Sequence, residues 1–304
     1  MTGSPSLREL TPTRGFLLGV GAAVVGLLPS VLAGWQPSWP TYPNTPDLFT
    51  GTFLPFAPDL LALMLGAVVL PGAIVGVVLR PRTAGTPGRV DAAATAGLVL
   101  VIALAALQSV AATVPRLRPE TSGLLDVAVG LTAVAVALVL SALVSRVLAH
   151  RTVPAATVAA AVVAVAAGYW LQSVLRITWS WGLQLPDGVI ATLAVITQVA
   201  PAVLLGAALA WCGWTPRRRL WAWTVALLIF GVGQAVLDAA TYWFVIARSP
   251  GSASPAQYVG VALDGLVWSL PYAAAAILVG VVGRLVAPHA RRRYREKKGT
   301  VPTA

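Results

Sequence analysis

Long uncharged apolar stretches, separated by short polar connections, run along almost the whole chain. These stretches lack the residue-by-residue alternation of membrane β-barrel strands. A bilayer core of roughly 30 Å is crossed by ~20 helical residues. Backbone groups in lipid must be hydrogen-bonded within their own segment, which favours helices. The pattern therefore predicts eight transmembrane helices, at 15–35, 60–79, 92–114, 124–145, 153–175, 188–212, 220–246 and 262–283.

The composition agrees with a chain that is nearly all membrane. Hydrophobic residues make up 58% of it and charged residues 10%, whereas soluble domains carry about 25% charged residues. We expect an all-α integral membrane protein with no soluble catalytic module. Its parts are a cytoplasmic N-terminal segment (1–14), an eight-helix transmembrane domain (15–283) and a basic cytoplasmic tail (284–304). Arg far outnumbers Lys, and Ala and Val dominate, which is typical of a GC-rich bacterial genome and indicates a bacterial plasma membrane.

The positions of Lys and Arg predict the orientation. With the N-terminus in the cytoplasm, 17 of the 21 Lys and Arg residues lie on the cytoplasmic side. This is a strong positive-inside bias. An even number of spans also returns the C-terminus to the cytoplasm. Four arginines fall on the outer side: Arg116, Arg118, Arg176 and Arg248.

The first span admits a second interpretation. Arg8 and Arg14 precede an apolar run that ends in Ala33-Gly34, which loosely resembles a signal-peptide cleavage site. Cleavage would leave seven spans with an outer N-terminus. The run is longer than the usual 7–15 apolar residues of a signal peptide, so we expect an uncleaved span.

Recurring polar residues indicate an internal repeat. Gln108, Gln172 and Gln234 stand at similar depths in the third, fifth and seventh spans. The even spans begin near an Asp, and three of them carry a proline in the middle. We expect four helical hairpins of one orientation, each running in, out and back in. The even-span residues are Asp59, Asp126, Asp187 and Asp264, with Pro71, Pro201 and Pro271.

Most catalytic and metal-binding patterns are missing from the sequence. The chain has two His residues, both in cytoplasmic segments, and offers no His/Cys cluster for a metal. All three Glu residues lie outside the spans, and both Lys residues lie in the tail, so neither a zinc-protease motif nor a phosphate-binding loop is present. We therefore predict no enzyme, no cofactor and no metal.

Charged residues within spans are costly and often functional, which singles out Asp238. Gln234 and Asp238 are four residues apart and share one helix face. Arg176 stands four residues after Gln172 in the same way, so we predict that Arg176 and Asp238 face a common interior and pair. One interpretation makes Gln108, Gln172, Gln234, Arg176 and Asp238 the lining of a polar cavity open toward the outer leaflet. The other makes the Gln side chains interhelical glue.

The tail carries a basic cluster just beyond the last span. Positive charges at this position are attracted to anionic lipid. Contact with a cytosolic protein partner is the alternative, and we expect no nucleic-acid binding. The residues are Arg291, Arg292, Arg293, Arg295, Lys297 and Lys298.

Three functions remain open from the sequence. The first is a carrier or permease-like protein for a small or amphipathic solute, acting through Asp238, Arg176 and the Gln residues. The second is a non-catalytic membrane subunit or assembly factor, for example the membrane partner of a transport ATPase. The third is a lipid-active membrane enzyme with Asp238 as an acid or base. It lacks a visible second catalytic group.

Overall fold

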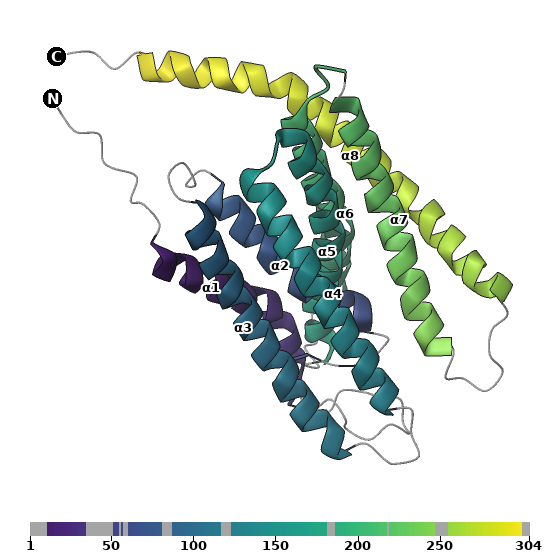
Figure 1. The fold of residues 1–304 in the computed structure, drawn as a ribbon. Coiled ribbons are helices and arrows are strands. Elements are labelled where there is room, and N and C mark those ends of the chain that lie inside the picture. Colours follow the sequence, from purple (N-terminus) through teal and green to yellow (C-terminus); the bar gives the residue numbers. More distant parts are fainter. Residues whose placement is uncertain are drawn as a thin grey trace.

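The structure is a computed structural model, and all regular secondary structure in the residues that it describes is helical (Figure 1). It describes residues 11–34, 51–54, 56, 60–80, 87–116, 123–180, 186–217, 219–246 and 255–299. Within these ranges, side chains are described except at 33–34, 87, 116, 123, 176–180, 244–246, 255 and 287–299.

Eight long helices account for most of the described residues, and a short 3-10 turn, η2 (Val114–Arg116), extends one of them. All eight are long and apolar enough to cross a membrane, which confirms the predicted multi-pass helical class. The helices are α1 (Pro12–Gly34), α2 (Leu61–Leu79), α3 (Pro87–Thr113), α4 (Gly123–His150), α5 (Val153–Ser180), α6 (Asp187–Cys212), α7 (Arg219–Ile246) and α8 (Pro255–Gly299).

Proline and glycine account for several helix ends. Pro12, Pro87 and Pro255 are the first residues of their helices, where the missing N–H costs no intrahelical bond. Gly213 ends α6 with a positive φ of 68°, a conformation that glycine adopts without strain. Its N–H donates to the Leu209 carbonyl at 2.9 Å, which satisfies one free carbonyl of the last turn.

The observed helices extend beyond several of the predicted spans, and α8 does so most. It begins at Pro255 and ends at Gly299, whereas the apolar pattern predicts 262–283. Hydropathy marks only the part that suits hydrocarbon, while a helix continues wherever its backbone bonds can form. The Arg, Lys, Glu and Ala residues that follow the apolar part are strong helix formers. The basic segment 284–304 is therefore helical as far as Gly299.

The most extensive contacts join helices two positions apart in the sequence: α1 packs on α3, α2 on α4 and α6 on α8. α5 also packs on α7, though less extensively than α7 packs on α8. Consecutive helices α1/α2, α5/α6 and α7/α8 also pack closely, whereas α3 and α4 touch much less. Two hydrophobic clusters result, one mainly among α1–α4 and the other mainly among α5–α8, and they are joined where α2 meets α5.

Glycines allow the paired helices to approach at backbone distance. A Cβ on Gly19 would overlap the Ala94 carbonyl of α3, and one on Gly72 would overlap the Ser141 carbonyl of α4. A Cβ on Gly206 would lie 2.7 Å from the Ala276 carbonyl of α8. Small residues at such positions are the usual means of close helix association in membranes.

The prolines in the middle of α2 and α6 pack against glycines of the preceding helices. Pro71 fills the space beside Gly26 of α1, and Pro201 fills the space beside Gly168 of α5. Pro cannot donate the backbone bond of a helix interior, so its ring breaks one turn of the ladder. At these two positions the ring is a packing element between neighbouring helices.

Part of the first predicted loop is buried between helices. Leu54 and Phe56 are 0% and 1% exposed, and the Phe56 ring lies against Gly130 of α4. The Leu54 N–H donates to Ser109 Oγ of α3 at 2.8 Å. The segment therefore lies between α3 and α4, which explains why these two helices contact each other so little.

Side-chain contacts tie the helix ends together on the side where α1 begins and α8 ends, which we call the terminal face (Figure 1). Arg80 donates to the carbonyls of Leu148 at 2.6 Å and Arg151 at 3.3 Å, and its guanidinium lies 4.4 Å from the Trp211 ring centroid. A hydrogen bond between the side chains of Asp91 and His150 joins α3 to α4 on the same face. We call the other side of the molecule the opposite face.

Candidate functional site

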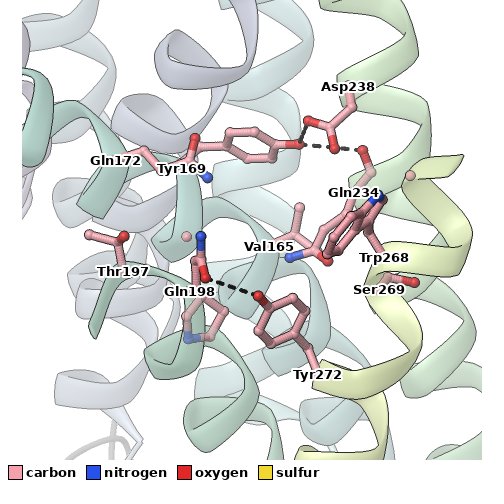
Figure 2. Close-up of a pocket in the computed structure, with 13 residues that line it drawn as sticks. Val165, Tyr169, Gln172, Thr197, Gln198, Gln234, Asp238, Trp268, Ser269 and Tyr272 are labelled. Carbon is pink, nitrogen blue, oxygen red and sulfur yellow. Dashed lines mark hydrogen bonds between the residues drawn. The ribbon is translucent and has the colours of Figure 1, made fainter. Parts of the chain in front are cut away.

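A polar pocket lies among the last four helices (Figure 2). It has a volume of about 220 Å³ and receives side chains from α5, α6, α7 and α8. Its polar lining residues are Tyr169, Gln172, Thr197, Gln198, Gln234, Asp238, Ser269 and Tyr272, and its other lining residues are Val165, Gly168, Pro201, Gly265 and Trp268.

The carboxylate of Asp238 is held by a tyrosine of the neighbouring helix. The Tyr169 hydroxyl donates to Asp238 Oδ1 at 2.7 Å and lies 3.3 Å from the Gln234 carbonyl oxygen (Figure 2). Tyr169 itself is 7% exposed, so the packing of α5 fixes the donor. Gly265 of α8 stands beside the second carboxylate oxygen, since a Cβ there would lie 3.8 Å from Asp238 Oδ2.

The polar groups deeper in the pocket differ in what they can offer a ligand. The Tyr272 hydroxyl donates to Gln198 Oε1 at 3.0 Å (Figure 2). The hydroxyls of Thr197 and Ser269 donate to carbonyls of their own helices, at 2.8 and 2.7 Å, so their protons are already used. The side-chain amides of Gln172 and Gln234 form no hydrogen bond with any other described residue. These two amides can therefore donate to or accept from a bound molecule.

The pocket lies nearer to the opposite face than to the terminal face. Asp238 and Gln172 each stand about eight residues before the end of their helices, which is roughly 12 Å of helix. Thr197 lies about ten residues into α6, at roughly 15 Å from the same face. A hydrocarbon core of roughly 30 Å would therefore contain all three groups. The site is polar at a depth where lipid-facing helices carry apolar side chains.

The structure brings together three of the five predicted site residues. Gln172, Gln234 and Asp238 line one pocket. Gln108 lies elsewhere, on α3, where its Oε1 accepts from the Phe53 N–H at 3.0 Å and its Nε2 donates to the Gly51 carbonyl at 2.6 Å. This Gln fixes the buried loop segment. It matches neither the predicted shared cavity nor the predicted layer of three Gln residues.

Several predicted side chains lie outside the described part of the structure. The backbone of Arg176 belongs to α5, but its side chain is not described, so its pairing with Asp238 stays a prediction. The lipid-contact residues Arg291 to Lys298 are placed on α8 in the same way. Asp59 falls in an undescribed stretch, while Asp187 begins α6, where its charge complements the helix dipole.

Five of the eight polar lining residues are not among the residues predicted from the sequence. Gln198 is an uncharged polar residue in the middle of an apolar span, and this position is a signal that the sequence itself carries. Tyr169 stands three residues before Gln172 and therefore shares its helix face. Tyr272 and Trp268 resemble any aromatic residue of a membrane helix, and only the packing of α8 brings them to the pocket.

The pocket combines a carboxylate, amides and aromatic rings. No group of three or more His, Cys, Asp or Glu residues that could hold a metal occurs in the described ranges. The lining places hydrogen-bond donors and acceptors in an otherwise apolar bundle, as small-molecule sites do. Comparison with known protein families, with characterised proteins and with solved structures finds no match to this chain.

Proposed function

We propose that this chain is a carrier or permease-like protein of the bacterial plasma membrane, with the pocket among α5–α8 as its solute site. The pocket around Asp238 carries the proposal, because a carboxylate within a membrane span is energetically costly and often functional. Gln172 and Gln234 supply uncommitted amides beside it. Arg176 remains part of the proposed site, on the strength of its position one turn beyond Gln172.

Equivalent contacts in the two halves of the chain support the predicted internal repeat, and such a repeat in turn supports the carrier proposal. Gly26 meets Pro71 between α1 and α2, and Gly168 meets Pro201 between α5 and α6. In the same way, α2 meets α4 through glycines, and α6 meets α8 through Gly206. We propose two related four-helix halves, each of two hairpins in one orientation. Repeats of this kind are common in carriers, whose solute sites lie within the membrane.

The remaining assignments concern the membrane surfaces. Both termini are proposed to be cytoplasmic, since this orientation places most Lys and Arg residues inside. The basic end of α8 is then proposed to contact anionic lipid headgroups. No catalytic step is assigned to the chain.

One observation favours a structural role for a different part of the molecule. Gln108 uses both ends of its amide to hold the loop segment at Gly51 and Phe53. This is the behaviour expected of a structural polar residue. A non-catalytic membrane subunit is therefore the second candidate function. In that case Asp238 and Tyr169 would serve only to join α7 to α5.

The two functions differ in whether Asp238 is needed once the protein is folded. We would compare strains that lack the chain, or carry it as wild type, Asp238→Asn or Asp264→Asn, on a panel of toxic solutes. Asp264 is the matched control, because it is an exposed Asp of α8 that does not line the pocket. All variants would be checked for equal amounts in the membrane.

A carrier predicts that loss of the chain changes sensitivity to at least one solute. Wild type and Asp264→Asn should restore the normal response, and Asp238→Asn should not. Equal restoration by Asp238→Asn and Asp264→Asn would contradict the carrier proposal and favour the structural subunit.

A further inference from the structure

We propose that the α5–α8 pocket binds a small organic cation of the alkylammonium class. The inference rests on the proposed solute-binding role of this pocket and names the chemistry of its solute. Three features of the lining carry it: the balance of charge, the aromatic rings and the size of the cavity.

Among the described lining residues, the balance of charge is negative. Asp238 is the one carboxylate among the lining residues, and none of the described lining residues is Lys, Arg or His. The Tyr169 hydroxyl neutralises part of the charge on Oδ1 through its hydrogen bond. Oδ2 has no such donor among the described residues. A bound cation would compensate the remaining charge in a low-dielectric setting, whereas an anion would add to the cost.

Three aromatic side chains line the same cavity. Tyr169 and Tyr272 belong to α5 and α8, and Trp268 stands one turn before Tyr272 on α8 (Figure 2). The faces of such rings attract cations, and aromatic cages of this kind are the usual way of recognising quaternary ammonium groups. A carboxylate together with several rings therefore favours a cation with an apolar surface.

The cavity is suited to a small solute. Its volume of about 220 Å³ is below the range of about 300–1,000 Å³ that is typical for drug-sized ligands. The amide oxygens of Gln172 and Gln234 can accept hydrogen bonds from ammonium protons, where the cation has them. The two amides therefore suit primary and secondary amines, while the rings suit methylated ones.

Three probes of similar shape and different charge test the inference directly. They are tetramethylammonium, the neutral neopentyl alcohol and the anion pivalate. The thermal unfolding midpoint of the purified full chain in lipid nanodiscs would be followed against the concentration of each probe, since a ligand of the folded state raises it. The proteins compared would be wild type, Asp238→Asn, Arg176→Ala and the control Asp264→Asn.

We expect tetramethylammonium to raise the midpoint of wild type and Asp264→Asn, and to bind Arg176→Ala at least as tightly as wild type, because that variant lacks a positive charge of the proposed site. Asp238→Asn should bind at least about tenfold more weakly, because removal of one charge of a close pair weakens binding by that much or more. Pivalate should have no effect, and neopentyl alcohol should have much less effect than tetramethylammonium. Similar midpoints without a probe would show that Asp238→Asn still folds.

Three results would overturn the inference. The first is an equal effect of neopentyl alcohol, which would mean that charge is not recognised. The second is stabilisation by pivalate alone. The third is tetramethylammonium binding that appears only in Arg176→Ala, which would make Arg176 the resident cation of Asp238.

The outcomes also separate this inference from the carrier proposal. If cation binding depends on Asp238 but solute sensitivity does not change, the cation site is supported and the carrier proposal is contradicted. If a solute phenotype depends on Asp238 but no cation binds, the carrier proposal is supported and alkylammonium ions are ruled out as its solutes.

Discussion

A single interhelical hydrogen bond, from Tyr169 to Asp238, sets the position of the one charged side chain among the described lining residues of the pocket. Tyr169 is buried on α5, and Asp238 is exposed toward the cavity on α7. The bond therefore aligns two helices and presents a carboxylate at the same time. Its energy is expected to be modest, because measured hydrogen bonds between membrane helices average about 0.6 kcal/mol.

A double-mutant cycle measures this bond. Tyr169→Phe, Asp238→Ala and the double variant should give a coupling free energy of about 0.6 kcal/mol, with an upper limit of about 1.7 kcal/mol. Reversible unfolding of the full chain in mixed micelles would provide the three differences in stability. A coupling energy within error of zero would mean that the two groups do not interact in the folded protein.

The sequence identifies some pocket residues and not others for a physical reason. Asp238 stands out because a charge in an apolar span is rare, and Gln234 follows from helical spacing. Tyr272 reaches the pocket only through the crossing of α8 and α6, which no local pattern reveals. Gln108 shows the opposite case. Its type and depth match those of Gln172, but the loop segment supplies its partners on α3.

At the scale of helices, the apolar pattern predicts the number of spans and most of their bounds. Membrane helices can be predicted from an apolar pattern because the backbone of a spanning segment finds no water to bond with in lipid and must form intrahelical hydrogen bonds. The ends of α8 are not readable, since a helix in water continues without any hydrophobic signal. In the sequence, glycines at four-residue spacing such as Gly15 and Gly19 are only a weak indication of helix pairing. The structure places both against α3.

The close contact of α1 with α3 depends on Gly19. Gly19→Ala would push a methyl group into the Ala94 backbone, which cannot move aside as a flexible side chain can. Gly21→Ala is the matched control, because a Cβ at Gly21 meets nothing within 4 Å. Ala also has a helix propensity about 1 kcal/mol better than that of Gly.

We therefore expect Gly19→Ala to lower the thermal unfolding midpoint and the yield of folded protein. Gly21→Ala should leave both unchanged or raise them slightly. Thermal unfolding monitored by fluorescence-detected size-exclusion chromatography measures both. Equal midpoints for the two variants would contradict the described packing of α1 on α3.

At the scale of the whole molecule, the two halves are not used alike. In the first half, Leu54 and Phe56 fill space between α3 and α4, and the hydrophobic cluster there is continuous. In the second half, α7 and α8 contact each other directly, and the polar pocket lies among the four helices. We propose that the first half is a stable support and that the second half holds the solute site.

We propose that the α5–α8 pocket is open to water from the outer side of the membrane. Single cysteines in a Cys212→Ser background, treated with a membrane-impermeant maleimide on intact cells, test it most directly. Gly188 and Gly88 provide the orientation controls, since both are exposed and a Cβ at either meets nothing within 4 Å. Ser173 and Ala235 are buried neighbours of the two pocket Gln residues and provide the packing controls.

Our account predicts labelling of Gly188→Cys, Gln172→Cys and Gln234→Cys. Gly88→Cys should be labelled only after the cells are opened, and Ser173→Cys and Ala235→Cys should stay unlabelled. Labelling of Gly188→Cys with both Gln positions silent would contradict an outward-open pocket. Labelling of Gly88→Cys in place of Gly188→Cys would reverse the orientation on which the account depends.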